Sequence, residues 1–543
     1  MNHIDRSIPG WFLLFSVVAF APAWGATFPY GVSSGVIAHD RAVVWTQTGD
    51  AATLTAQVSA DATFDEIVLE TSVGTTPGRD YTAKLIVTGL SASTDYHYRF
   101  TDVVDGSISP TGRFRTPPAP HESEPLRFVF SGDSNYRRAP FHVLDFAVDE
   151  EAGFFLWFGD TIYGDAPAGE LGVARTLDDY RAKYRQIRVD SALRRMLAST
   201  GAVVGWDDHE VANDYDGGDP DGAISRERID AAYRAFFEHM PIAEEGIADD
   251  PYRTYRRIRW GRTAEFFVLD GRQYRDRDAE DLCGGNVDPF GVVFGFFADP
   301  ACIEALREPR TMLGPEQLAW LKTGLAASDA AVKFIVSDLP FTFFGPVPYD
   351  RWDGYDAERR EILEFIDAQR IEDVWILTTD LHVNVYNPDV NSVLRRHRPE
   401  IDLDNGIEVP EVIAGPIATS TFAQAAIREA GAMLGIEASL GTSPLLEGLF
   451  NDVVLWIERM NELAFIETNR YGYAVVEVSA DGKVGLAFRG IDPQASDVVT
   501  IATLFDTRAI DERVPGLCGA VGLLPLIFTA LMLGAWSECR RRR

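Results

Sequence analysis

The fold of this chain is best understood from one stretch of its sequence, Phe154-Phe155-Leu156-Trp157-Phe158-Gly159-Asp160-Thr161-Ile162-Tyr163-Gly164-Asp165. Its five large apolar residues are too few for an ordinary helix and predict a strand buried on both faces, as in a parallel sheet. Gly159 then allows the chain to turn, so Asp160 projects from the carboxyl end of the strand, where open α/β sheets bind ligands. On its own, such a pattern more often marks a strand that ends in a simple turn.

Four further apolar strands end in the same way, at Asp133, Asp207-Asp208, Asp270 and Asp380. Between them, apolar periodicity predicts helices over 138–148, 177–198, 226–239, 315–326 and 357–368, and an antiparallel pair of strands over 469–478 and 484–489. Alternating strands and helices predict an α/β domain. Carboxylates gathered at one edge of a sheet repel one another unless cations neutralise them. With His382 beside Asp380, the pattern therefore favours a site for two metal ions.

The N-terminal part of the chain differs in kind. Short strands separated by turn residues predict an all-β module over 27–118. The segment from Leu90 to Tyr98 resembles a strand entry of fibronectin type III domains, in which a tyrosine packs at the corner of a sandwich. The polar, proline-rich stretch 117–124 is the expected linker to a catalytic domain over 125–492.

Charge limits the partners that this protein can bind. The 543 residues carry a formal net charge of −32. A field of that sign repels polyanions, so we expect no nucleic acid partner held by charge. It does not exclude a small anionic substrate, because bound cations can invert the potential inside a site.

Both ends of the chain carry signals of the cell envelope. Residues 1–25 read as a secretory signal peptide. Residues 516–536 are apolar throughout and are followed by four arginines, which predicts a C-terminal membrane anchor or a sorting tail that is removed later. We therefore expect an exported protein of the periplasm or cell surface. Cys283 and Cys302 lie in one loop-like region of this exported domain, and we expect a disulfide between them.

Several motifs, in order and spacing, resemble the alkaline phosphatase D (PhoD-like) family of metallophosphatases. No single motif is specific, but their ordered combination is. They are Phe158-Gly159-Asp160-Thr161-Ile162-Tyr163, Trp206-Asp207-Asp208-His209-Glu210, Leu269-Asp270-Gly271-Arg272, Met312-Leu313-Gly314, Trp352-Asp353-Gly354-Tyr355 and Thr379-Asp380-Leu381-His382. The resemblance implies an α/β metallophosphatase sandwich, with two packed sheets flanked by helices, after an all-β module of the immunoglobulin or fibronectin type.

The resemblance also implies roles for single residues. Asp160 corresponds to the carboxylate that bridges two metals, and Tyr163 to a phenolate ligand of ferric iron. The other expected metal ligands are Asp133, Asp208, Asp380 and His382. His209 is expected to contact the phosphate or act as general acid, with Asp208 beside it. Asn213 and Arg275 are expected to bind phosphate, although Arg275 could instead form a salt bridge.

Some members of the family place a cysteine at the first strand end, where this chain has Asp133. The metal pair therefore stays open: the resemblance implies iron with calcium, while manganese, zinc and magnesium remain alternatives. We expect a monomer that hydrolyses phosphomonoesters or phosphodiesters with a metal-activated water. A phospholipase D-like or teichoic acid-type phosphodiesterase is an alternative, and so is a surface binding protein with a decayed site.

Overall fold

The structure is a computed structural model. It describes residues 27–217, 224–243, 250–277, 309–343, 350–397, 403, 405–433, 435, 437–494 and 499–507. Three expectations lie outside these residues: the signal peptide at 1–25, the Cys283–Cys302 disulfide and the apolar segment 516–536.

A nine-stranded mixed sheet contains the apolar run from Phe154 to Phe158. At its centre β8 (Leu126–Ser131), β9 (Phe154–Phe158) and β10 (Gly201–Gly205) are parallel neighbours. All five residues of β9 are fully buried, as their uninterrupted apolar run predicts. Next to β8 lie β18 (Tyr471–Val478) and β19 (Val484–Ile491), which form the expected antiparallel pair. The outer strands are β20 (Ala502–Asp506), β1 (Val32–Ala38), β2 (Arg41–Gln47) and β5 (Thr82–Thr88).

A seven-stranded sheet packs face to face against the first. Its order is β11 (Arg256–Trp260), β12 (Ala264–Val268), β13 (Val332–Val336), β14 (Val374–Thr378), β16 (Glu411–Ile413), β15 (Asn384–Asn387) and β17 (Phe465–Glu467). Aromatic rings fill the space between the sheets. The ring of Phe128 stacks on Phe154 with centroids 5.1 Å apart and meets the edges of Phe266 and Phe334. These contacts fix the sheets against each other.

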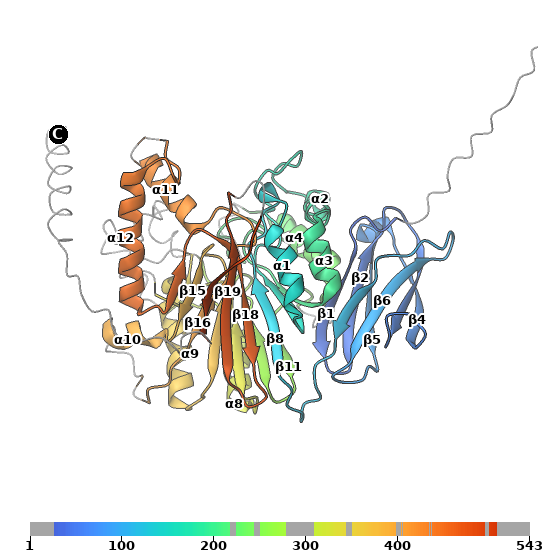
Figure 1. The fold of residues 1–543 in the computed structure, drawn as a ribbon, viewed down its shortest axis with the longest axis horizontal. Coiled ribbons are helices and arrows are strands. Elements are labelled where there is room, and N and C mark those ends of the chain that lie inside the picture. Colours follow the sequence, from blue (N-terminus) through green and yellow to red (C-terminus); the bar gives the residue numbers. More distant parts are fainter. Residues whose placement is uncertain are drawn as a thin grey trace, which may run out of the picture. The chain divides into compact units, whose positions relative to one another are not determined.

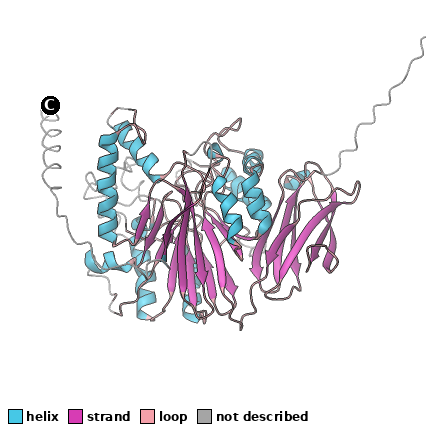
Figure 2. Ribbon diagram, in the orientation of Figure 1, coloured by secondary structure: helices cyan, strands magenta, loops and turns pink. Residues whose placement is uncertain are grey.

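Helices cover the two outer faces of this pair of sheets (Figures 1 and 2). Over the nine-stranded sheet lie α1 (His142–Ala147), α2 (Leu177–Ile187), α3 (Ser191–Ser199) and α4 (Arg226–His239), packed on side chains such as Trp157. Over the seven-stranded sheet lie α8 (Gly314–Ala327) and α9 (Asp356–Ala368), packed on Phe267 and Ile335. The remaining described helices are α10 (Asn391–His397), α11 (Phe422–Met433) and α12 (Pro444–Asn461). The result is the expected α/β arrangement of two packed sheets flanked by helices.

The single helix predicted over 177–198 is two helices. The first ends at Ile187, and Asp190 begins the second by accepting a hydrogen bond from the Leu193 N–H at 2.9 Å. An aspartate in this position satisfies a backbone donor that would otherwise lack a partner, so the helix restarts there. Apolar periodicity continues through the break, which explains why the sequence reads as one helix.

The N-terminal strands belong to two sheets. Four of them, β4 (Ile67–Gly74), β3 (Thr53–Ser59), β6 (Asp95–Asp102) and β7 (Gly112–Arg115), form a separate sheet. It packs on β1, β2 and β5 around a core that includes Val44, Val58 and Phe100. Because Gly35 of β1 pairs in parallel with Ala202 of β10, the large sheet continues from the N-terminal module into the following domain.

The expected C-terminal membrane anchor is not supported. Within the described ranges, no helix is long and apolar enough to cross a bilayer. We therefore withdraw membrane anchoring through a C-terminal helix as an expectation for this protein.

Candidate active site

Four strand ends bring the acidic side chains together. Because β8, β9 and β10 are parallel, the aspartates that follow them lie along one edge of the sheet. The segment after β14 adds Asp380 and His382 from the second sheet. Asp133, Asp160 and Asp380 have left-handed backbone conformations, with φ of 59°, 46° and 66°. Such turns are uncommon for residues with side chains, and they recur at functional sites.

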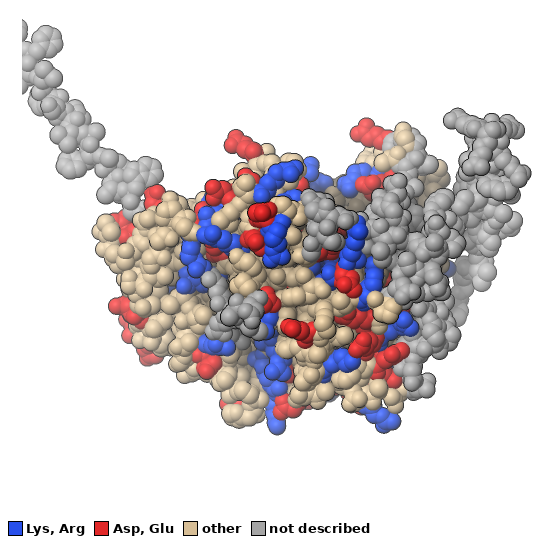
Figure 3. Space-filling model, turned by 180° about the vertical axis from the view of Figure 1, so that it is seen from behind, with Lys and Arg blue, Asp and Glu red and all other residues tan. Residues whose placement is uncertain are grey.

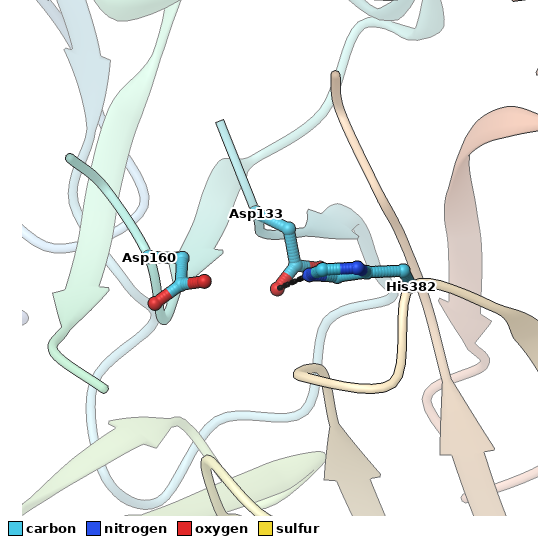
Figure 4. Close-up of side chains that lie close together, drawn as sticks. All are labelled: Asp133, Asp160 and His382. Carbon is cyan, nitrogen blue, oxygen red and sulfur yellow. Dashed lines mark ion pairs between the residues drawn. The ribbon is translucent and has the colours of Figure 1, made fainter. Parts of the chain in front are cut away.

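Two groups of ligand atoms meet at Asp160. Atoms of Asp133, Asp160 and His382 lie within 4.8 Å of one another, and so do atoms of Asp160, Asp208 and His209. Figure 4 shows the first group, with the imidazole of His382 beside the Asp133 carboxylate and Asp160 facing the same space. The His382 Nε2 atom is 3.9 Å from Asp133 Oδ1. Asp160 is therefore placed to serve two ions at once.

The carboxylates of Asp133 and Asp160 are buried without adequate partners. Both oxygens of Asp133 and Oδ1 of Asp160 accept no well-formed hydrogen bond from the described residues. Burial raises the pKa of both carboxyl groups well above its usual range, and neighbouring Asp208 adds to the effect. Buried carboxylates normally have a hydrogen-bond or ion-pair partner. Two neighbouring buried carboxylates without such partners therefore indicate a binding site for a cation.

Space for the Asp133 carboxylate depends on a glycine. Gly415 has a φ of 148°, and a Cβ atom added to it would lie 2.4 Å from Asp133 Oδ2. Any other residue here would strain the backbone and displace the carboxylate.

Tyr163 closes one side of the site. Its hydroxyl lies 3.2 Å from His382 Nε2, and its ring lies against that of His209 with centroids 4.2 Å apart. Burial raises the pKa of Tyr163 well above its usual range, and Asp160 and Asp133 raise it further. A phenolate here therefore requires a cation close to its oxygen. We call Asp133, Asp160, Tyr163, Asp208, His209 and His382 the strand-end site.

His209 is held in a fixed orientation. Its Nδ1 is 2.7 Å from Asp165 Oδ1, while its Nε2 points toward Asp160, 3.9 Å from Oδ2. Burial by itself would lower the pKa of His209, but the charges of Asp160, Asp208 and Asp165 outweigh burial and raise that pKa well above its usual range. The imidazolium can thus carry a proton at Nε2, the atom that faces Asp160.

A buried ion network supports the floor of the site. Arg272 is fully buried, and its Nε donates to Asp207 Oδ1 at 2.5 Å. Asp350, from the segment before Trp352, accepts from Arg272 and from Arg275. The two guanidinium groups hold the pKa of Asp350 well below its usual range, although burial acts in the opposite direction. The network ties the strand ends of both sheets to the segment around residue 350.

The residues of the strand-end site fit a pair of metal ions. Carboxylate oxygens, imidazole nitrogen and phenol oxygen are ligands for hard or borderline cations, and sulfur is absent from the set. The oxygens of Asp133 that lack hydrogen-bond partners are the atoms that such ions would satisfy.

Comparison with known proteins agrees with this geometry. A family model described as PhoD-like phosphatase matches residues 128–482, and one described as its N-terminal domain matches residues 18–118. The chain belongs to the PhoD-like phosphatase family. Alkaline phosphatase D of Bacillus subtilis (strain 168) is 31% identical over 392 residues, which cover 66% of this chain and 64% of that protein. A solved structure of PhoD matches with a TM-score of 0.72 and 25% identity, over 88% of this chain and 89% of that one.

The structure of this PhoD-like chain brings together most, but not all, of the residues singled out in the sequence. Asp380 belongs to neither ligand group. Burial raises the pKa of Asp380 well above its usual range; the charge of Asp207 adds to this effect, and the charge of Arg272 opposes it. Its role as a ligand stays a prediction.

The two expected phosphate-binding residues lie in other surroundings. The Arg275 guanidinium pairs with Asp350 and donates to the carbonyls of Asp214 and Tyr215 at 2.9 Å each. Arg275 therefore forms a salt bridge, the alternative to phosphate binding, and its partner Asp350 lies 75 residues further along the chain. The Asn213 side chain is exposed and donates to Asp214. Phosphate binding by Asn213 or Arg275 stays a prediction that rests on the family resemblance alone.

Two side chains that support the PhoD-like site are not among the residues predicted from the sequence. Asp165 orients His209, and it lies only two residues after Tyr163 in the sequence. Glu210 accepts hydrogen bonds from the N–H groups of Thr161 and Ile162 and, through its other oxygen, from Asp207 N–H at 2.8 Å. Its position directly after His209 was the available signal. Glu210 thereby joins the loops that follow β9 and β10.

Proposed function

We propose that this chain is an exported, metal-dependent phosphoesterase that hydrolyses phosphomonoesters, phosphodiesters or both. The observation that carries the proposal is the position of Asp160, whose carboxylate is shared by two groups of ligand atoms. Membership of the PhoD-like phosphatase family supports the reaction class. The leader expected at residues 1–25 supports export.

The proposed ligands divide into two sets. Asp133, Asp160, Tyr163 and His382 would hold one ion, for which ferric iron suits the phenol. Asp160 and Asp208 would hold the other, for which calcium suits an oxygen-rich set. Bound ions of this kind lower the pKa of water and neutralise charge on phosphoryl oxygens.

The chain's own part in hydrolysis is proton transfer and orientation. A water oxygen bonds to phosphorus while the ester P–O bond breaks, and the leaving oxygen takes up a proton. The His209 Nε2 atom faces the ligand groups and is the proposed donor of that proton. Asp165 holds the other nitrogen, so that the ring keeps Nε2 directed into the site.

The test compares p-nitrophenyl phosphate with bis-p-nitrophenyl phosphate, each with protein as purified, after chelation and after metal is restored. We expect hydrolysis of at least one substrate, loss on chelation and recovery with metal, while Asp160→Asn is inactive throughout. If neither substrate is cut with any added metal, the protein is not a phosphoesterase of this kind. Metal analysis and a visible absorption band that Tyr163→Phe removes would identify ferric iron; an active, iron-free sample would exclude it.

A further inference from the structure

Three arginines lie on two segments that adjoin residues of the strand-end site in the chain or in space. Arg137 and Arg138 end the short helix η2 (Tyr136–Arg138), which follows the first strand end, and Arg428 is on α11. Arg138 and Arg428 approach the same hydroxyl, with a guanidinium nitrogen of each 3.5 Å from Ser420 Oγ. Segments almost 300 residues apart in sequence thus place two cations around one side chain.

Ser420 connects these cations to the metal-ligand residues. Just before it in the chain, the Ala418 N–H donates to the Asp133 carbonyl at 3.1 Å, and a β-bridge joins Ala418 to Ser134. The Phe422 N–H donates to the His382 carbonyl at 3.0 Å. The segment 418–422 therefore contacts residues of the strand-end site and, through Ser420, the two arginines.

Structural ion pairs do not account for these arginines. In the part of the chain that the structure describes, Arg137 and Arg138 form no ion pair with a carboxylate. Among the described residues, the one carboxylate that pairs with Arg428 is that of its neighbour Glu429, at 3.2 Å, and both side chains are about half exposed. Such exposed pairs contribute little to stability. Figure 3 shows the molecule from behind, a face on which basic and acidic side chains are interspersed.

Guanidinium groups that form no buried ion pair create a local positive potential beside the strand-end site, in a protein whose net charge is −32. Arginine binds carboxylate and phosphate groups with two parallel hydrogen bonds, and it keeps its charge at every physiological pH. A ligand held by its phosphoryl group at the strand-end site would have these guanidinium groups near it, because both contact Ser420, two residues before Phe422, whose N–H donates to the His382 carbonyl.

We propose that Arg138 and Arg428 bind a second anionic group of the substrate, so that the preferred substrates are phosphate esters whose leaving group carries a carboxylate or a further phosphate. This inference rests on the proposed phosphoesterase function. Ser420 separates the two guanidinium groups and gives the second anion a hydroxyl donor. Arg138 and Arg428 determine specificity and take no part in bond breaking.

The experiment measures binding, so that it does not depend on turnover. Propylphosphonate and 3-phosphonopropanoate share a carbon skeleton, but only the second carries a terminal carboxylate. Calorimetry on the metal-loaded protein should show that 3-phosphonopropanoate binds about tenfold more tightly than propylphosphonate. In the double variant Arg138→Gln/Arg428→Gln, the two dissociation constants should become equal within about twofold.

Two controls accompany the variant. Arg262→Gln removes an exposed arginine at the opposite end of the seven-stranded sheet, where it lies 3.6 Å from Asp329, and it should leave the ratio of dissociation constants unchanged. The double variant Arg138→Lys/Arg428→Lys keeps both positive charges but cannot form the two parallel hydrogen bonds of a guanidinium group. It should retain part of the preference for 3-phosphonopropanoate that the glutamine double variant loses.

Equal affinity of the wild-type protein for both phosphonates would overturn the inference, and so would a preference that survives in the glutamine double variant. Hydrolysis of p-nitrophenyl phosphate, measured on the same preparations, reports separately on the proposed function. A protein that prefers 3-phosphonopropanoate through its arginines but cuts no ester would retain the binding site and lose the proposed activity.

Discussion

Asp133 shows, at the scale of single residues, how function and stability oppose each other. Its buried carboxylate lacks well-formed hydrogen bonds and lies close to Asp160 and Asp208. Asparagine has nearly the same shape without the charge. We therefore predict that Asp133→Asn stabilises the chelated protein by at least about 1 kcal/mol, because it removes repulsion and a desolvation cost. Metal should stabilise the wild type strongly and the variant little. Thermal melting with and without chelator measures both effects.

Asp270 provides the matched control, because it is equally buried but well bonded. It accepts hydrogen bonds from Thr254 Oγ1 at 2.6 Å and from Gln273 N–H at 3.0 Å. Asp270→Asn should destabilise the protein in both conditions. If Asp133→Asn also lowered the melting temperature of the chelated protein, the carboxylate would be stabilised by contacts other than metal.

Asp165 gives a second prediction at this scale. It touches His209 and lies outside the ligand groups, so it is a positioning residue. Asp165→Asn should lower kcat about 10- to 100-fold with little change in KM, because the ring of His209 loses the acceptor that fixes its orientation. Metal content measured on the same sample should be unchanged. Asp178→Asn, at an exposed site on α2, should have wild-type kinetics.

At the scale of secondary-structure elements, Glu358 joins α9 to the start of α8. Its two oxygens accept the N–H groups of Met312 at 2.9 Å and Leu313 at 3.1 Å. Burial raises the pKa of Glu358 from 4.5 to about 7. The folded protein thus keeps this proton to higher pH than the unfolded chain does. The stabilising contribution is complete below the unfolded pKa and is lost as the pH rises through the folded pKa.

We therefore predict that the wild type loses up to about 3 kcal/mol of stability relative to Glu358→Gln between pH 4.5 and pH 7. Above that window the difference should stay constant. Urea unfolding of both proteins across this range measures it. Glu361→Gln, on an exposed face of the same helix, should show no such trend. A pH-independent gap between wild type and Glu358→Gln would mean that Glu358 is ionised throughout.

The elements themselves were largely predictable, for reasons visible in particular residues. The run from Phe154 to Phe158 is uniformly apolar and short, which predicts a strand buried on both faces, and the structure confirms this strand. The strand β11 went unrecognised because its sequence Arg-Arg-Ile-Arg-Trp is mostly charged, which is tolerable only at the edge of a sheet. The pairing of Arg272 and Arg275 with Asp350 could not be foreseen, since partners so far apart in sequence meet only through the tertiary fold.

At the scale of the whole molecule, the N-terminal module and the catalytic domain share buried contacts as well as a sheet. Trp45 of β2 is fully buried, and its Nε1 donates to the Glu238 carbonyl at 2.9 Å. The guanidinium of Arg188, from the break between α2 and α3, lies 4.1 Å from the centroid of the Trp45 ring. Nearby, His239 Nε2 lies 3.1 Å from Asp80 Oδ2. The module is therefore expected to fold as part of the enzyme.

Trp45→Ala tests that conclusion. The change removes the ring beneath the buried Arg188 and leaves a cavity between the two parts, so we predict a loss of about 3–5 kcal/mol. Because both parts contribute walls to this cavity, calorimetry should show one transition, shifted to lower temperature, in which the N-terminal module and the catalytic domain unfold together. Trp45→Phe should cost less, and Trp456→Ala, at a half-exposed position, should cost little. An early transition confined to the N-terminal module would show instead that the two parts fold independently and that the shared sheet does not couple them.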